Sequence, residues 1–164
     1  MDKKQLVNTL ELWVDRLISE HAEKRKSCFN DYPELENYFD KITLSESYYV
    51  VVDNAPMPDM PETRGSELAQ YIDMNVSAIT YKDTYFIRED HSNDLGIHFH
   101  ELIHVLQWHY LGAEAFIERY IEELLTFGYD NAPLEKMAYE LEGRFSSGEV
   151  FSVEPLVEQM LFEG

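Results

Sequence analysis

The chain has 164 residues, of which 45 % are hydrophobic and 27 % are charged. This length and composition suit one domain, residues 1–164, with a packed core, and they exclude a disordered chain. With 32 acidic and 13 basic residues, the formal net charge is −19, which argues against a nucleic-acid partner or an anionic membrane surface because both attract basic patches.

The first predicted elements are a long helix and a strand. Apolar residues recur at helical spacing from Leu6 to Ile18, so residues 4–24 are predicted to form one amphipathic helix. The segment SYYVVVD (47–53) is β-branched and aromatic and is predicted to be a strand. Three prolines and a glycine in NAPMPDMPETRG (54–65) predict a surface loop, either a plain connection or part of a substrate cleft.

Two more strands and a central helix follow a short predicted helix at 66–73. Residues 76–81 and 84–88 are predicted to be strands joined by a tight turn at 82–83. A helix is predicted from Leu95 to Tyr110. Its N-cap candidates are Ser92, Asn93 and Asp94, and Gly112 follows its end.

The C-terminal third is predicted to be helical, with helices near 116–125, 133–145 and 154–161. Strands and helices are therefore segregated along the chain. This order predicts an α+β fold with a small antiparallel sheet, an active-site helix and C-terminal helices.

The N-terminal segment has no uninterrupted apolar core, so we expect no signal peptide and a cytoplasmic protein. No segment reaches the roughly 20 apolar residues needed to span a bilayer. Cys28 is the only cysteine. It cannot form an intrachain disulfide, and we expect a buried, inert thiol.

The central predicted helix contains His100-Glu101-Leu102-Ile103-His104, an HExxH pattern. A helix turns about 100° per residue, so residues i and i+4 lie on one face and can bind one Zn²⁺ at about 2.0–2.1 Å. Glu101 is expected to act as general base toward the water that zinc activates. The alternative interpretation is two surface histidines on an acidic helix.

The third metal ligand is not fixed by this pattern. A third histidine six residues after His104, with a glycine three residues after it, would be one solution. Gln107 and Tyr110 occupy those positions. The other solution is a glutamate from a downstream helix, and six residues qualify by type: Glu118, Glu122, Glu123, Glu135, Glu140 and Glu142.

HELIHVLQW followed by NAPLEKMAYE resembles the gluzincin metallopeptidases, thermolysin-like zincins whose third ligand is a helical glutamate. The resemblance covers mainly residues 76–145. In that family a small residue often stands three positions after the ligand. Glu135, followed by Ala138, matches this better than Glu140, so the resemblance implies Glu135 as third ligand.

The resemblance also implies that the strand before the metal helix, Tyr85 to Arg88, edges the cleft and pairs with an extended peptide. Family members usually have an acidic residue four positions after the ligand glutamate, where this chain has Tyr139. Other candidates for contact with substrate are Trp108, Tyr129 and Tyr139. His98 is expected at the surface or behind a metal ligand.

The leading hypothesis is therefore a zinc-dependent metallopeptidase acting on a peptide or protein substrate. Two alternatives remain open. One is a zincin-fold binding or regulatory module without turnover, and the other is a zinc hydrolase acting on a non-peptide amide. The sequence does not specify the oligomeric state.

Overall fold

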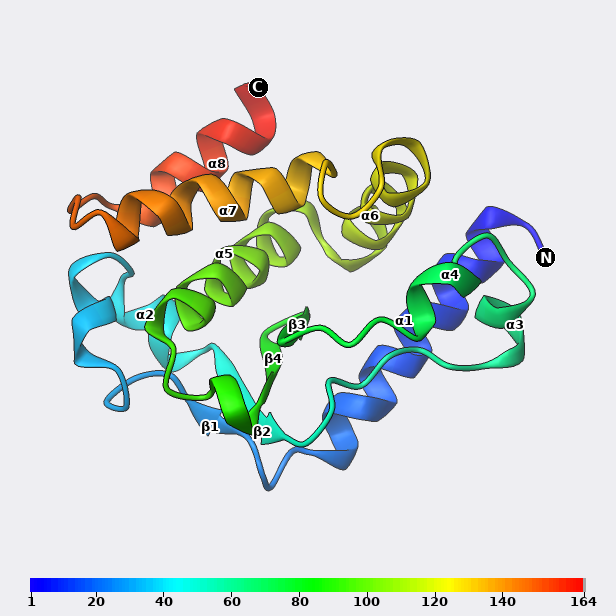
Figure 1. Ribbon diagram of the computed structural model, residues 1–164, viewed down its shortest axis with the longest axis horizontal. Coiled ribbons are helices and arrows are strands. Elements are labelled where there is room, and N and C mark those ends of the chain that lie inside the picture. Colours follow the sequence, from blue (N-terminus) through cyan, green and yellow to red (C-terminus); the bar gives the residue numbers. More distant parts are fainter. Residues whose placement is uncertain (164) are drawn as a thin grey trace.

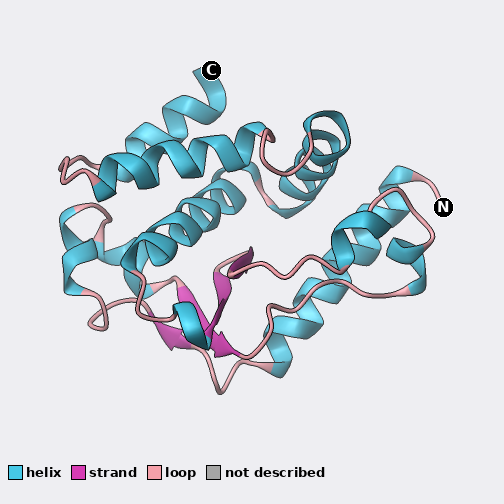
Figure 2. Cartoon of the chain, viewed as in Figure 1, coloured by secondary structure: helices cyan, strands magenta, loops and turns pink. Residues whose placement is uncertain are grey.

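The computed structural model describes residues 1–163 and has an α+β fold (Figures 1 and 2). Its helices are α1 (Lys3–Glu20), α2 (Lys41–Ser45), α3 (Pro61–Arg64), α4 (Ala69–Ile72), α5 (Leu95–Leu111), α6 (Ala113–Phe127), α7 (Pro133–Ser146) and α8 (Val153–Glu163). Two 3₁₀ turns are η1 (Pro33–Asn37) and η2 (Glu89–His91). The strands are β1 (Lys26–Ser27), β2 (Tyr48–Val52), β3 (Ala78–Tyr81) and β4 (Thr84–Arg88).

The four strands form a mixed sheet in the order β1-β2-β4-β3. β2 and β4 are parallel, whereas the other two pairs are antiparallel. The prediction of an antiparallel sheet was therefore wrong. The chain between β2 and β4 makes a long excursion through α3, α4 and β3, which allows it to return beside β2 in the same direction.

The predicted hairpin of β3 and β4 is confirmed. Lys82 has a φ of 58° in the tight turn between the strands. The hairpin lies at one side of the sheet, so β3 is an edge strand and β4 lies inside the sheet between β2 and β3. This position of β4 corrects the expectation that Tyr85 to Arg88 would line a cleft.

α5 is the central helix of the molecule and lies between α7 and the sheet (Figure 1). Every residue from His98 to Trp108 is buried. Asp94 is the N-cap, and its side chain accepts hydrogen bonds from the backbone N–H groups of Gly96 and Ile97. Gly112, with a φ of 83°, ends α5 and allows the chain to turn into α6.

α1 packs against α6 and has four buried apolar residues, Val7, Leu10, Val14 and Leu17. It ends at Glu20 instead of the predicted residue 24, and the His21 ring nitrogen Nδ1 contacts the Leu17 carbonyl at this end. The predicted loop 54–65 contains the single turn of α3, which begins at Pro61. Among the described residues, no helix is long and apolar enough to cross a membrane.

Candidate metal centre

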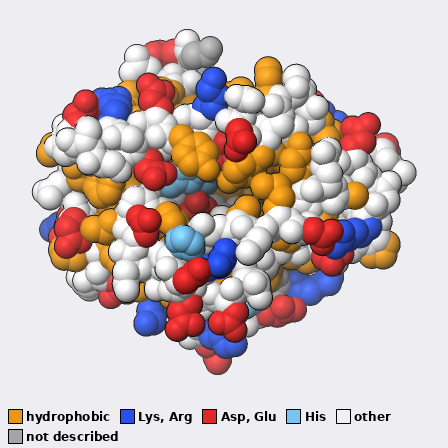
Figure 3. Space-filling model, viewed as in Figure 1, with side chains coloured by type: hydrophobic (Ala, Val, Ile, Leu, Met, Phe, Trp, Pro, Cys, Tyr) orange, Lys and Arg blue, Asp and Glu red, His pale blue; other side chains and the backbone are white. Residues whose placement is uncertain are grey.

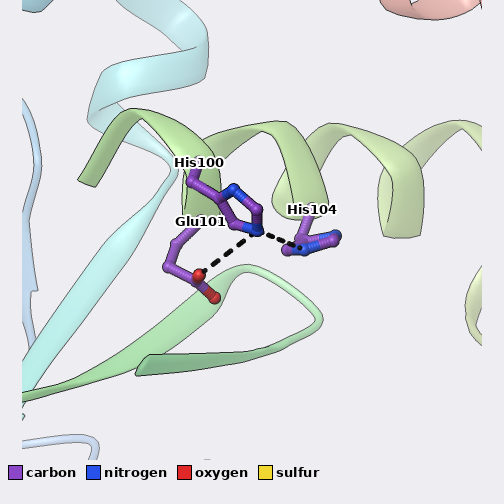
Figure 4. A group of neighbouring side chains, drawn as sticks. All are labelled: His100, Glu101 and His104. Carbon is purple, nitrogen blue, oxygen red and sulfur yellow. Dashed lines mark hydrogen bonds and ion pairs between the residues drawn. The ribbon is translucent and has the colours of Figure 1, made fainter. Parts of the chain in front are cut away.

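Three side chains of α5 converge on the side of the helix that faces the sheet (Figure 4). His100, Glu101 and His104 each offer a ligand atom, and these atoms lie within 4.8 Å of one another. All three side chains are buried. The i to i+4 spacing brings the two imidazoles together: their Nε2 atoms are 3.2 Å apart. This buried group could bind a metal ion.

Glu135 reaches the same point from the first turn of α7. Its Oε1 lies 3.2 Å from Nε2 of His100 and 3.2 Å from Nε2 of His104. Pro133 starts this helix at a position where its missing N–H costs no hydrogen bond. A carboxylate in the first turn is also favoured by the helix dipole. Glu140, the alternative third ligand, is exposed.

The Nε2 atoms of His100 and His104 and the Oε1 atom of Glu135 form a nearly equilateral triangle. Its side lengths can be compared with the distances between ligands around a bound metal ion. Ligand atoms arranged tetrahedrally around an ion at about 2.0–2.1 Å are roughly 3.3 Å apart. The observed separations are all 3.2 Å. The two imidazoles and the carboxylate are therefore spaced as ligands of a single metal ion would be.

Both imidazoles are held by acceptors on their other nitrogen. Nδ1 of His100 lies 2.9 Å from Oε1 of Glu142, and Nδ1 of His104 lies 2.7 Å from Oε1 of Gln107. An Nδ1–H group that donates to these oxygens leaves the Nε2 lone pair directed at the metal position. Sequence reasoning missed the orienting role of both residues, because neither their spacing nor their type marks it.

In the metal-free protein these contacts shift the ionisation of the cluster. Burial lowers the pKa of His100, but hydrogen bonds with Glu135 and Glu142 outweigh it and raise that pKa to about 10. The pKa of His104 is also raised, because attraction to Glu135 exceeds the effect of burial. Burial raises the pKa of Glu135, and the two imidazolium groups overcome this and hold it well below its usual range.

Glu101 is held by β3 and stands beside the triangle. Its Oε1 accepts a hydrogen bond of 2.9 Å from the hydroxyl of Thr80. Its Oε2 lies 4.0 Å from Nε2 of His100. Burial raises the pKa of Glu101, with the neighbouring histidines acting in the opposite direction. Glu101 thus lies directly beside the triangle of His100, His104 and Glu135.

An apolar cavity of about 150 Å³ opens beside the centre. Figure 3 shows a hollow on this face in which hydrophobic and histidine side chains are visible. Glu101, His104 and Glu135 contribute to its wall. α1, β3 and α6 supply most of the rest, including Leu10, Trp13, Ile79, Phe116, Ile121 and Leu124.

Three of the predicted contact residues lie at or near this cavity. Trp108 and Tyr129 line it. The Trp108 ring stacks on Phe116 at 4.2 Å, and its indole N–H has no hydrogen-bond partner among residues 1–163. Tyr139 is half exposed, and its ring centroid lies 4.5 Å from that of His100.

Two predicted contact residues lie elsewhere, because β4 is an internal strand. Tyr85 is fully buried in the core, and its hydroxyl lies 2.6 Å from Nδ1 of His98. Arg88 forms an ion pair with Asp90 and does not line the cavity. His98 is itself fully buried, which corrects its expected place at the surface, and its ring nitrogens contact the Tyr85 hydroxyl and the Ser92 carbonyl rather than a proposed metal ligand.

The chain was also compared with known proteins. No protein-family model, curated protein or solved structure matches it. Any function proposed for this centre therefore depends on its own geometry and chemistry.

Proposed function

We propose that this protein is a zinc-dependent metallopeptidase with a zincin-like arrangement. His100, His104 and Glu135 would hold the metal, and Glu101 would act as the catalytic base. The observation that carries the proposal is the triangle of two Nε2 atoms and one Oε1 atom with sides of 3.2 Å, with Glu101 beside it. Neutral imidazole and carboxylate are ligands that suit zinc in catalytic sites.

A zinc ion held there would supply a Lewis acid that polarises a carbonyl group and lowers the pKa of water to about 7. Glu101 would take the proton of the attacking water and later give it to the leaving amine. Two features support this role. Thr80 fixes one carboxylate oxygen of Glu101, and burial raises the pKa of Glu101 although the neighbouring histidines act in the opposite direction.

The substrate would lie between β3 and the cavity. β3 is the edge strand beside α5, so an extended peptide could pair with its outer side. The cavity volume is similar to that of an apolar cavity that holds one benzene ring. No Lys or Arg lines the cavity within residues 1–163, and the inner wall carries Glu101 and Glu135. We therefore expect an uncharged aromatic or branched aliphatic side chain next to the cleaved bond.

The test combines metal analysis with turnover. Purified protein should contain close to one equivalent of zinc and should cleave an unstructured protein such as casein. Glu101→Gln should keep its zinc and lose at least about 99 % of the activity, since a positioned base contributes roughly 10²–10⁴-fold. Glu140→Gln, a matched change at an exposed glutamate of α7, should behave like wild type.

Each outcome separates the hypotheses. A protein that binds no zinc, even when zinc is supplied, overturns the metal centre. Equal activity in wild type and Glu101→Gln would come from a contaminating peptidase. Bound zinc without turnover of peptides or simple amides would favour a binding or regulatory module, and turnover of amides alone would favour a non-peptide substrate.

A further inference from the structure

The two carboxylate oxygens of Glu135 have different neighbours. Oε1 lies 3.2 Å from both imidazole Nε2 atoms, at the metal position. Oε2 points away from it and accepts a hydrogen bond of 2.5 Å from the hydroxyl of Tyr120 on α6. Tyr120 also lines the cavity beside the centre. A tyrosine hydroxyl therefore occupies one of the two oxygens that Glu135 could offer to a metal.

The backbone that carries Glu135 is held as well. The N–H of Leu134 donates to Oε1 of Glu123 on α6 at 2.7 Å, and Oε2 of Glu123 accepts from Arg119 at 2.9 Å. The carbonyl of Leu134 accepts from the amide Nε2 of Gln107 on α5 at 3.0 Å. Both polar groups of Leu134 are thus held by neighbouring helices, which fixes the backbone at Glu135 and leaves the contact with Tyr120 to hold Oε2.

We propose that Tyr120 is a positioning residue that makes Glu135 a one-oxygen ligand and so keeps a coordination position open for water. The proposal rests on the metal centre proposed above. A carboxylate can bind a metal through one or both oxygens. Catalytic zinc sites have three protein ligands and an open fourth position. If Glu135 bound the metal through both oxygens, the second oxygen would occupy the coordination position that the water needs.

Tyr120→Phe tests this role because it removes only the hydroxyl. Tyr81→Phe is the matched control: Tyr81 also lines the cavity, but its hydroxyl donates to the carbonyl of Pro56 at 2.8 Å and contacts no proposed ligand. Zinc affinity is measured by competition with a chelator. Coordination number is read from the visible absorption of the Co²⁺-substituted protein, which weakens when four ligands become five.

We expect Tyr120→Phe to bind zinc about 10–100-fold more weakly, as is usual when a group that holds a ligand is lost. Its Co²⁺ absorption should fall, while Tyr81→Phe should match wild type in both measurements. Identical affinity and Co²⁺ spectra in Tyr120→Phe and wild type would overturn the role of Tyr120. Wild type that binds neither ion would instead overturn the metal centre itself.

A second measurement does not depend on the folding of a variant. X-ray absorption or crystallography of zinc-loaded wild type should show one short bond to a Glu135 oxygen and none to the other. Two short bonds to Glu135 would contradict the proposal, although the metal centre would stand. Circular dichroism of both Phe variants checks that altered metal binding does not reflect unfolding.

Discussion

The amide oxygen of Gln107 lies 2.7 Å from Nδ1 of His104, and the amide nitrogen of the same side chain donates to the carbonyl of Leu134. Gln107 is fully buried. One side chain therefore orients a proposed metal ligand on α5 and also holds the residue before Glu135 on α7. The two helices that form the centre are joined by this residue.

Gln107→Leu should weaken zinc binding and destabilise the protein. It leaves Nδ1 of His104 buried without its partner, at a cost of about 1–3 kcal/mol, and removes the hydrogen bond from the Gln107 amide to the Leu134 carbonyl. Loss of the group that orients His104 should also reduce zinc affinity about 10–100-fold. Chelator competition and urea unfolding measure the two effects. Gln70→Leu, at an exposed glutamine, should change neither, and unchanged zinc affinity in Gln107→Leu would refute the orienting role.

Zinc affinity should rise with pH. In the metal-free protein the pKa of His100 is raised to about 10, because its hydrogen bonds to Glu135 and Glu142 outweigh the effect of burial. Near pH 7 the ring therefore carries a proton that zinc must displace. Below pH 10 the apparent affinity should increase about tenfold per pH unit for each proton released. Calorimetry in two buffers with different ionisation enthalpies counts the protons.

Glu142→Gln provides a control for this pH effect. The variant removes one of the carboxylates that raise the pKa of His100, so fewer protons should be released near pH 8 and the affinity should change less steeply with pH. An affinity that does not depend on pH in wild type would show that His100 is neutral before zinc binds.

The cavity should determine which peptides are cleaved. A Phe or Leu side chain buried there should gain about 2 kcal/mol over Ala, which is roughly thirtyfold in kcat/KM. Asp should be worse than Ala, because the cavity is mostly apolar and no Lys or Arg of residues 1–163 lines it. Peptides that differ only beside the cleaved bond measure this, and equal rates for Leu and Asp would refute it.

Two neighbouring leucines of α6 allow a matched test of the same cavity. Leu124 lines the cavity, whereas Leu125 is 41 % exposed. Leu124→Phe should fill part of the cavity and lower kcat/KM for a Phe-containing peptide about tenfold, in keeping with the roughly 1–3 kcal/mol by which a pocket distinguishes small size differences. Leu125→Phe should leave kcat/KM for the same peptide unchanged.

Cys28 should be unreactive until the protein unfolds. Burial raises the pKa of its thiol to about 12, so the reactive thiolate is scarce at neutral pH. Its Sγ lies 3.5 Å from the hydroxyl of Tyr85 in the core. A thiol reagent should label Cys28 at least a hundredfold more slowly in buffer than in denaturant, and comparable rates would show that the site opens readily.

The sequence by itself determined the features that depend only on residues close to one another in the chain. Asp94, one of the three N-cap candidates, caps α5, the turn at Lys82 joins β3 to β4, and His100 and His104 share a face because they are four residues apart. Each follows from backbone geometry within a few residues. Two proposed metal ligands and the proposed base could be named for the same reason.

Only the tertiary structure decided what depends on distant contacts. Glu135 lies 31 residues from His104, and its position beside the histidines depends on how α7 packs on α5. Glu142 and Tyr120 contact the proposed ligands from other helices, and Gln107 joins α5 to α7 through the carbonyl of Leu134. The order of the strands, which buries Tyr85 and leaves β3 at the edge, depends on a crossover that no local pattern encodes, because pairing joins segments far apart in the chain.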